Sequence, residues 1–249
     1  MKIIYEKNNR NIEVDSGYFF AKAIFETILI TNKAIFLEKH IERLNKSLKK
    51  ININKIINIE LIENFIKENS LKNCVLKIVV SEKNIVATTR EINYTEEDYL
   101  KGFKLGISKV RRNTTSILPY IKSTGYIENL IEREKAIENG KNEVLFLNEN
   151  NKITECSTGN IFFTKDKKIF TPSDSCALLN GIIRGWIIEN YSVIEGEFEL
   201  NDLFDADEVF ITNSVIGIMK IVELNEKKYT SSCMSEKIKN EYLKIVEEI

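Results

Sequence analysis

The sequence predicts an α+β fold in two halves. Segments with apolar residues at helical spacing are mixed with shorter strand-like runs, without the regular βαβ order that is typical of a parallel sheet covered by helices. A polar, aperiodic stretch at residues 110–116 lies near the middle of the 249-residue chain and marks the best boundary. We therefore expect an N-terminal α+β domain at 1–110, a linker at 111–118 and a C-terminal α+β domain at 119–249.

In the N-terminal half, apolar periodicity predicts two helices. Ile41, Leu44 and Leu48 recur at helical spacing within residues 38–50, and a similar pattern covers 59–68. Two strand pairs are expected before and between these features, 2–6 with 11–14 and 23–30 with 33–37. Further strand-like runs occupy residues 74–80, 84–90 and 103–110.

The C-terminal half is predicted to begin with a helix whose apolar residues are Ile127, Leu130, Ile131 and Ile137. Ser123 or Thr124 is a candidate cap, and Asn139-Gly140 is a stop signal. Two more helices are expected at 181–190 and 233–248. Strand-like runs separated by polar turns occupy residues 143–147, 152–156, 160–164, 168–171 and 208–212.

Charge and composition exclude several classes of function. Acidic and basic residues nearly cancel, to a net charge of −1 and a pI near 6.1, so the chain has no overall attraction to nucleic acid or anionic membranes. No apolar run approaches the ~20 residues of a membrane span, and charges interrupt the N-terminus too early for a signal peptide. The cysteines lack metal-ligand or redox spacing, which favours reduced thiols and a cytoplasmic protein.

The chain has one histidine, His40. A zinc site with two histidine ligands is therefore impossible, and we expect no metal. A Ser-His-Asp triad would have to use His40. If the protein is an enzyme, proton transfer is expected from Lys, Glu, Asp or Tyr.

Among many lysines, Lys122 has unusual neighbours. Apolar and small residues surround it just before a predicted helix, and no carboxylate lies within five residues on either side. Such surroundings can desolvate an ammonium group and lower its pKa, as a Schiff-base lysine requires. The local context alone favours a solvated surface lysine.

Five features in order resemble the class IV aminotransferase family, the pyridoxal-phosphate (PLP) enzymes of fold-type IV. They are spread over residues 17 to about 222, nearly the whole chain, with Glu155 following Lys122 by 33 residues. They are residues 25–27 (FET), 40–47 (HIERLNKS), 122–126 (KSTGY), 154–162 (TECSTGNIF), and 179–184 (LNGIIR) combined with 208–214 (EVFITNS). The resemblance implies a two-domain α+β architecture of the D-amino-acid aminotransferase type, with PLP as cofactor and a small amino compound as substrate.

The resemblance also implies roles for individual residues. Lys122, in the C-terminal domain, would hold PLP as a Schiff base and then move a proton, and Glu155 would keep the pyridine nitrogen protonated. The planar fork of Arg43 would bind the phosphate, and Tyr126 would contact the phenolic oxygen. His40 is interpreted as structural.

The remaining cofactor contacts implied by the family come from the C-terminal half. Leu179 would pack against the pyridine ring. Backbone amides of Ile182 and Ile183 would bind the phosphate at a helix N-terminus, and Asn213 with Ser214 would complete that phosphate cup. The resemblance further implies a homodimer whose cofactor lies between the two halves of each chain.

Two segments depart from the family pattern. Relatives usually carry a Gly-Asp-Gly-like run where this chain has Ala21-Lys22-Ala23, and they tend to place an arginine near the position of Glu82. Both stretches belong to substrate-handling regions in relatives. The residues that bind the cofactor are therefore expected to be intact, whereas the residues that bind the substrate are not assigned by the resemblance.

Three activities of the family compete for this sequence. The lyase that converts 4-amino-4-deoxychorismate to 4-aminobenzoate and pyruvate is favoured by residues 212–214 (TNS) and by the short chain. Branched-chain and D-amino-acid transamination are the alternatives. A non-catalytic relative that binds a small anion is a further alternative, suggested by Ala21-Lys22-Ala23.

Overall fold

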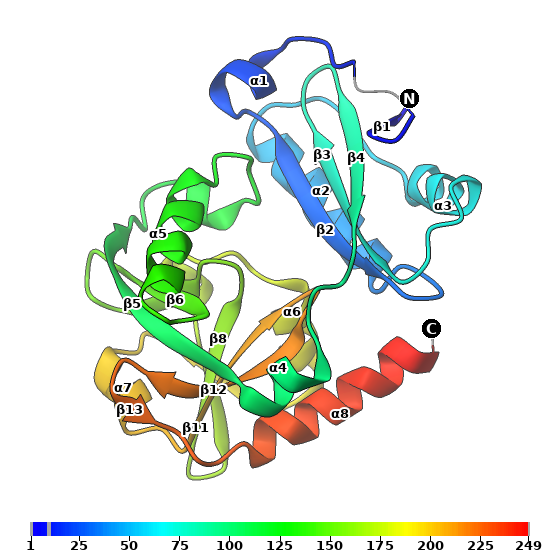
Figure 1. Cartoon of the computed structure of the whole chain (residues 1–249). Coiled ribbons are helices and arrows are strands. Elements are labelled where there is room, and N and C mark those ends of the chain that lie inside the picture. The colour runs from blue at the N-terminus through cyan, green and yellow to red at the C-terminus, as the bar shows by residue number, and fades with distance from the viewer. Residues whose placement is uncertain (1, 9–10, 249) are drawn as a thin grey trace. The chain divides into compact units, whose positions relative to one another are not determined.

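The structure, a computed structural model, describes residues 2–8 and 11–248, and it divides into two compact units (Figure 1). The first unit contains the chain up to residue 93, the segment Ile121–Tyr126 and the C-terminal end from Val246. The second contains Tyr94–Tyr120 and Ile127–Ile245. The units mix strands and helices, which confirms the predicted α+β class.

The first unit is built on a small mixed sheet flanked by helices. Among the described residues its strand order is β1-β4-β3-β2, with β1 parallel to β4 and the other neighbours antiparallel. Its elements are β1 (Ile4–Tyr5), α1 (Ser16–Phe20), β2 (Ile24–Ile30), α2 (Leu37–Lys50), α3 (Ile59–Glu68), β3 (Cys74–Val80) and β4 (Ile85–Arg90).

Alternation along β2 creates the core of this unit. Ile24, Ile28 and Ile30 are fully buried and belong to one apolar cluster with Leu44 and Leu48 of α2. In a strand, alternate side chains face opposite sides, so Glu26 shares the buried face with these isoleucines. Figure 1 shows α2 lying along β2, and β2 is an edge strand of its sheet.

The second unit contains a larger mixed sheet. Its order over the described residues is β10-β9-β8-β11-β12-β5-β6-β7, with β13 added beside β12. Its strands are β5 (Phe103–Arg112), β6 (Glu143–Asn148), β7 (Ile153–Cys156), β8 (Asn160–Lys165), β9 (Lys168–Pro172), β10 (Val193–Gly196), β11 (Glu208–Asn213), β12 (Gly217–Leu224) and β13 (Lys227–Lys228). Its helical elements are α4 (Glu96–Lys101), η1 (Leu118–Tyr120), α5 (Ile127–Glu138), η2 (Asp174–Cys176), α6 (Ile182–Asn190), α7 (Leu200–Phe204) and α8 (Cys233–Glu248), although the end of α8 is grouped with the first unit.

The central strands of this sheet bring several loops to one end. β8 and β11 pair antiparallel, with Thr212 opposite Asn160. The start of β8 and the end of β11 therefore lie side by side, so the turn at residues 157–159 and the turn after Asn213 come together. Both strands are buried almost along their whole length, which fixes this end of the sheet.

Most of the predicted elements are present with similar bounds. The helices over 38–50, 59–68, 181–190 and 233–248 are confirmed, as are the strands from 74 to 110 and from 143 to 171. The expected hairpin of 2–6 with 11–14 is wrong, because β1 pairs in parallel with β4 and residues 11–14 form no strand. Residues 33–37 also form no strand, since only Ala34 bridges to Ile30 before α2 begins.

The units differ from the domains expected at 1–110, 111–118 and 119–249. β5 pairs with β6 and β12, so its residues belong to the second unit and leave no linker there. Residues 121–126 pair with β2 instead, which assigns Lys122 to the first unit. Ser123 and Thr124 therefore serve this pairing, and α5 begins later, at Ile127.

The apolar residues expected to anchor α5 are exposed, with Ile127 at 67% and Leu130 at 49% of their accessible surface. The helix buries Asn129, Glu132 and Ala136 instead.

Within the described residues, no helix is both long and apolar enough to cross a membrane. All four cysteines carry free thiols.

Candidate active site

The backbone around Lys122 is fixed to the edge of β2. The N–H of Phe25 donates to the carbonyl of Lys122 at 2.8 Å, and the N–H of Thr124 donates to the carbonyl of Ala23 at 2.9 Å. Ser123 forms a bridge with Ile24. The segment that contains the predicted catalytic lysine is therefore held against β2 by an isolated β-bridge and the hydrogen bonds on either side of it.

The side chain of Lys122 lies among aromatic rings. Its Nζ is 4.6 Å from the centre of the Phe25 ring and 5.5 Å from that of Tyr126. Phe25 and Tyr126 contact each other edge to face, with ring centres 5.5 Å apart. The structure thus brings Lys122 and Tyr126 together, as expected, and adds Phe25 as a ring that contacts both of them.

Lys77 is a second cation on this ring, and sequence reasoning missed it. Its Nζ is 4.6 Å from the centre of the Phe25 ring, and Lys77 is paired with Thr27 across β2 and β3. Neighbouring atoms partly desolvate its ammonium group and lower the pKa of Lys77, with the charge of Arg90 acting in the same direction, although the side chain stays exposed. One polar residue in the apolar run of β3 was the available signal.

Arg43 forms a two-pronged contact with Glu26. Its Nε donates to Glu26 Oε1 at 2.8 Å and its Nη2 donates to Oε2 at 2.7 Å. His40 Nδ1 lies 2.7 Å from the same Oε2. Burial opposes ionisation of Glu26, but the charge of Arg43 and the hydrogen bonds with Arg43 and His40 outweigh it and lower the pKa of Glu26 to about 2.

In the second unit, Glu155 and Leu179 are adjacent, as expected for two cofactor contacts. Glu155 is buried in β7 and its Oε2 accepts the N–H of Leu179 at 3.0 Å. Asn160 Nδ2 donates to the carbonyl of Leu179 at 2.7 Å. Both backbone polar groups of Leu179 are therefore held by side chains.

The N-terminus of α6 carries the two isoleucines predicted to bind phosphate. Gly181 is its N-cap residue, and none of the described side chains caps this end. The first amides of a helix and its dipole attract anions. Ile182 and Ile183 are buried and are positioned so that their backbone, rather than their side chains, can serve a ligand.

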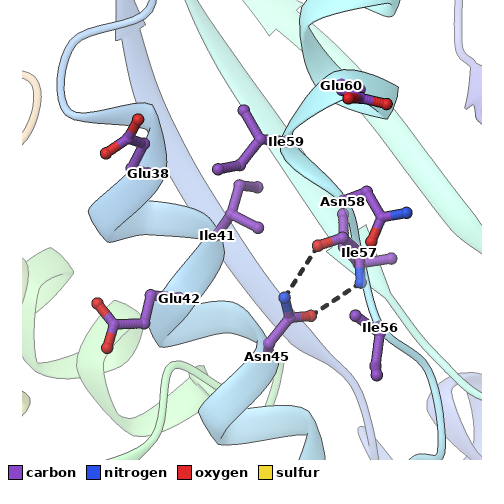
Figure 2. A pocket seen from close by; sticks show the side chains of 9 residues that line it. All are labelled: Glu38, Ile41, Glu42, Asn45, Ile56, Ile57, Asn58, Ile59 and Glu60. Atoms are coloured by element: carbon purple, nitrogen blue, oxygen red, sulfur yellow. Dashed lines mark hydrogen bonds between the residues drawn. The ribbon is translucent and has the colours of Figure 1, made fainter.

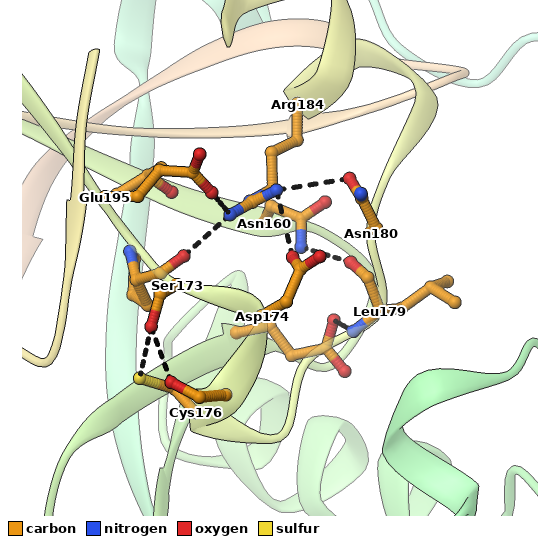
Figure 3. Close-up of polar contacts among 12 residues, drawn as sticks. Asn160, Ser173, Asp174, Cys176, Leu179, Asn180, Arg184 and Glu195 are labelled. Atoms are coloured by element: carbon orange, nitrogen blue, oxygen red, sulfur yellow. Dashed lines mark hydrogen bonds and ion pairs between the residues drawn. The ribbon is translucent and has the colours of Figure 1, made fainter.

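Arg184 anchors the loop before α6 (Figure 3). It is the last residue of the 179–184 motif, and the sequence did not predict a role for it. It is 1% exposed, and its guanidinium contacts Asp174 at 3.2 Å and Glu195 at 2.5 Å. It also donates to Asn180 Oδ1 at 3.1 Å and to the carbonyl of Pro172 at 2.9 Å. A buried guanidinium needs such partners, and together they fix the path of the chain through Leu179 and Gly181.

The side chain of Asn213 stabilises a turn. Its Oδ1 accepts the N–H groups of Val215 and Ile216, both at 2.9 Å, and its Nδ2 donates to the carbonyl of Thr158 at 3.0 Å. Ser214 follows it, half-buried. A ligand contact by Asn213 would therefore use its backbone.

Glu143 binds the turn at residues 157–159. The sequence did not predict this role. This buried carboxylate accepts hydrogen bonds from the Ser157 hydroxyl, the Ser157 N–H at 3.1 Å and the Thr158 hydroxyl at 2.6 Å. Among the described residues, the hydroxyl of Thr212 is buried without a hydrogen-bond partner. The turn at 157–159 is thus held by several hydrogen bonds, and β11 beside it contains one buried hydroxyl, on Thr212, without a described partner.

The residues present fit PLP in chemical type. The first unit offers an amine held against aromatic rings and an oriented guanidinium, while the second offers a buried carboxylate, a helix N-terminus and an orphaned hydroxyl. The aldehyde, the phosphate and the pyridine nitrogen of PLP each have a matching group among these residues.

A pocket beside α2 does not share this chemistry (Figure 2). It is lined by Glu38, Ile41, Glu42, Asn45 and residues 56–60. Its three glutamates disfavour a phosphate, and Asn45 is engaged with the backbone of Ile57 at both ends of its amide. No residue predicted to bind the cofactor lines it.

The two departures from the family pattern meet each other. Lys22 Nζ donates to Glu82 Oε1 at 2.7 Å. Ala21 ends α1 with φ at 53°, a conformation that favours glycine.

Comparison with known proteins agrees with this chemistry. A family model described as amino-transferase class IV matches residues 23–224. The chain is 30% identical over 241 residues to an aminodeoxychorismate lyase of Bacillus subtilis, covering 87% of this chain and 82% of the relative. It is 27% identical over 250 residues to a D-alanine aminotransferase of Listeria monocytogenes, covering 89% and 85%. The solved structure of a candidate 4-amino-4-deoxychorismate lyase from Legionella pneumophila matches with a TM-score of 0.87 at 24% identity, over 98% of this chain and 100% of that one.

Because the family model spans most of the chain, the protein belongs to the class IV aminotransferase family, whose members are PLP-dependent enzymes. The resemblance inferred from the motifs is confirmed. Solved lyases and aminotransferases share its fold, which also confirms the fold-type IV architecture.

We predict that Gly181→Ala destabilises the protein and weakens PLP binding. An added Cβ would lie 2.0 Å from Asn160 Oδ1, so the buried Asn160 would have to release the carbonyl of Leu179. Overpacking of this kind costs about 1–3 kcal/mol. Urea denaturation and a cofactor titration measure the two effects.

Gly185→Ala in the same helix is the matched control. Nothing lies within 4 Å of its added Cβ, and alanine in a helix interior is favoured over glycine by roughly 0.5–1 kcal/mol. Equal behaviour of the two variants would show that the close approach of Gly181 to Asn160 has no consequence.

Proposed function

We propose that this enzyme is the PLP-dependent lyase that converts 4-amino-4-deoxychorismate to 4-aminobenzoate and pyruvate. The observation that carries the proposal is the 30% identity, over 87% of this chain, to the Bacillus subtilis aminodeoxychorismate lyase. The site supports it by supplying an amine, Lys122, and a buried carboxylate, Glu155, for removal of a proton next to an amino group.

In this proposal each residue assigned by the family resemblance has one role toward the cofactor. Lys122, Arg43 and Tyr126 of the first unit would hold its aldehyde carbon, phosphate and phenolic oxygen. The second unit would supply Glu155 to the pyridine nitrogen, Leu179 to the ring, and a phosphate cup made of Ile182, Ile183, Asn213 and Ser214.

When bound, PLP supplies an electron sink for the carbon that bears the substrate amine. Lys122 Nζ removes the proton from that carbon, with Phe25 and Tyr126 limiting its contact with water. Glu155 keeps the pyridine nitrogen protonated, which favours electron withdrawal. Enolpyruvate would then leave with the electrons of the broken C–O bond and would receive the proton held by Lys122, and the ring of the product would become aromatic.

Transamination is the second candidate function. It is favoured by the 27% identity to the Listeria D-alanine aminotransferase, which covers 89% of this chain. It would use Lys122 and Glu155 in the same proton removal and differ in the fate of the carbanion. The non-catalytic alternative is disfavoured because both of these side chains are present and ordered by neighbours.

We predict that Lys122→Ala abolishes turnover and leaves the protein folded, because its amine is the only group assigned to proton removal. Purified wild type should be yellow, and borohydride should fix the cofactor to Lys122. A turnover assay measures the loss of activity, circular dichroism measures folding, and peptide mapping locates the fixed cofactor. Lys77→Ala is the control, since Lys77 lies at the same 4.6 Å from the Phe25 ring; it should keep the fixed label. Normal activity in Lys122→Ala would refute the assignment.

Incubation with 4-amino-4-deoxychorismate should release 4-aminobenzoate and pyruvate in equal amounts without an added keto acid. A lyase returns the cofactor as the aldehyde after each turnover, whereas a transaminase leaves it as an amine and shows ping-pong kinetics. Product quantification and absorbance after mixing with D-alanine, leucine or glutamate separate the two. If an amino acid bleaches the yellow colour of the cofactor, 2-oxoglutarate restores it and 4-amino-4-deoxychorismate is not consumed, the activity is transamination instead.

We also propose a homodimer. The family resemblance implies it, and exposed apolar side chains on α5, including Ile127, Leu130, Ile131 and Ile137, support it because such patches commonly mark interfaces. Sedimentation at micromolar concentration should give a species of twice the 28.8 kDa chain mass. A single species of chain mass would contradict the proposal.

A further inference from the structure

A fully buried carboxylate, Glu26, lies between Arg43 and the single histidine of the chain. Glu26 is 0% exposed and His40 is 1% exposed, while Arg43 keeps a partly exposed side chain. Three hydrogen-bond contacts of 2.7–2.8 Å converge on the two oxygens of Glu26. A surface arginine does not need a buried carboxylate and a buried histidine to hold its side chain, so this cluster calls for another explanation.

We propose that Glu26 and His40 are positioning residues that fix the guanidinium plane of Arg43 for the phosphate of the cofactor. The inference rests on the proposed function, in which Arg43 binds that phosphate.

The geometry of Arg43 supports this role. The guanidinium group has five N–H donors in one rigid plane, and the two directed at Glu26 come from Nε and Nη2. A side-on pair of this kind leaves the plane no freedom to rotate. The long side chain therefore presents one orientation to a ligand, which reduces the ordering cost of binding.

The secondary structure places all three groups in register. His40 and Arg43 are three residues apart on α2, so they lie on the same side of the helix. Glu26 is on the face of β2 that packs against α2, one residue after Phe25, which contacts Lys122. The edge strand β2 thus sets the positions of both Lys122 and Arg43.

His40 acts as a neutral donor in this cluster. Burial lowers the pKa of His40, and the charges of Arg43 and Lys122 act in the same direction, while Glu26 opposes them. Because Glu26 is ionised, it can only accept, so Nδ1 of His40 carries the proton that it donates. The hydrogen bond from neutral His40 therefore orients Oε2 of Glu26 without adding a charge to the cluster.

The experiment uses the full-length holoenzyme and two matched comparisons. Glu26→Gln keeps the shape but removes the charge, and His40→Asn keeps an amide donor near the position of Nδ1, whereas His40→Leu does not. PLP affinity is measured by titration, and the environment of the bound phosphate by its ³¹P NMR shift. We expect Glu26→Gln to weaken affinity roughly 10-fold to 100-fold and to move the ³¹P signal. His40→Leu should act in the same direction, and His40→Asn should remain close to wild type.

Arg43→Ala separates this inference from the proposed function. We expect it to weaken PLP binding roughly 30-fold to 150-fold, and Glu26→Gln should add nothing in that background if Glu26 acts through Arg43. Unchanged affinity and ³¹P shift in Glu26→Gln or His40→Leu, with Arg43→Ala impaired, would overturn the positioning role and leave the phosphate role intact. Unchanged affinity in Arg43→Ala would remove the phosphate role itself. If Glu26→Gln fails to fold, equal PLP affinities in His40→Asn and His40→Leu would overturn the inference.

Discussion

The chemistry of the first unit depends on a backbone pairing between β2 and the segment 121–126. The hydrogen bond from Phe25 N–H to Lys122 C=O, 2.8 Å long, sets the position of Lys122 along the strand. The same strand then carries Phe25 against the lysine side chain and Glu26 against Arg43. Errors in register would displace every one of these groups, because a shift by one residue exchanges the two faces of a strand.

The second unit holds its candidate ligands by a different device. Strands β8 and β11 are buried nearly throughout, and three charged or polar side chains, two buried and one half-buried, hold nearby loops. Arg184 ties the loop before α6, Glu143 ties the turn at 157–159, and Asn213 ties the turn after β11. Rigid loops reduce the ordering cost that a bound cofactor would otherwise impose.

The sequence predicted the helices, which depend on local spacing of apolar residues, and missed the strand partners, which depend on residues far away in the chain. Amphipathic spacing was sufficient for α2, α3 and α8. The parallel partner of β1 lies about eighty residues away, at Val86 and Ala87, and no local signal reports such a partner. The assignment of Lys122 to the second domain failed for the same reason, because its segment pairs with a strand about one hundred residues earlier. The exposed isoleucines of α5 show that apolar spacing locates a helix without showing what covers it.

The contact between Lys22 and Glu82 has a consequence for how such sequences diverge. One loop carries a base and the other an acid, and the two charged groups are joined at 2.7 Å. Solvent screens an exposed pair, and its contribution to folding is small. Reversal of one charge alone would nevertheless place like charges together, so the two loops are constrained to change jointly. Chimeric enzymes that exchange one of these loops with a relative should therefore exchange both.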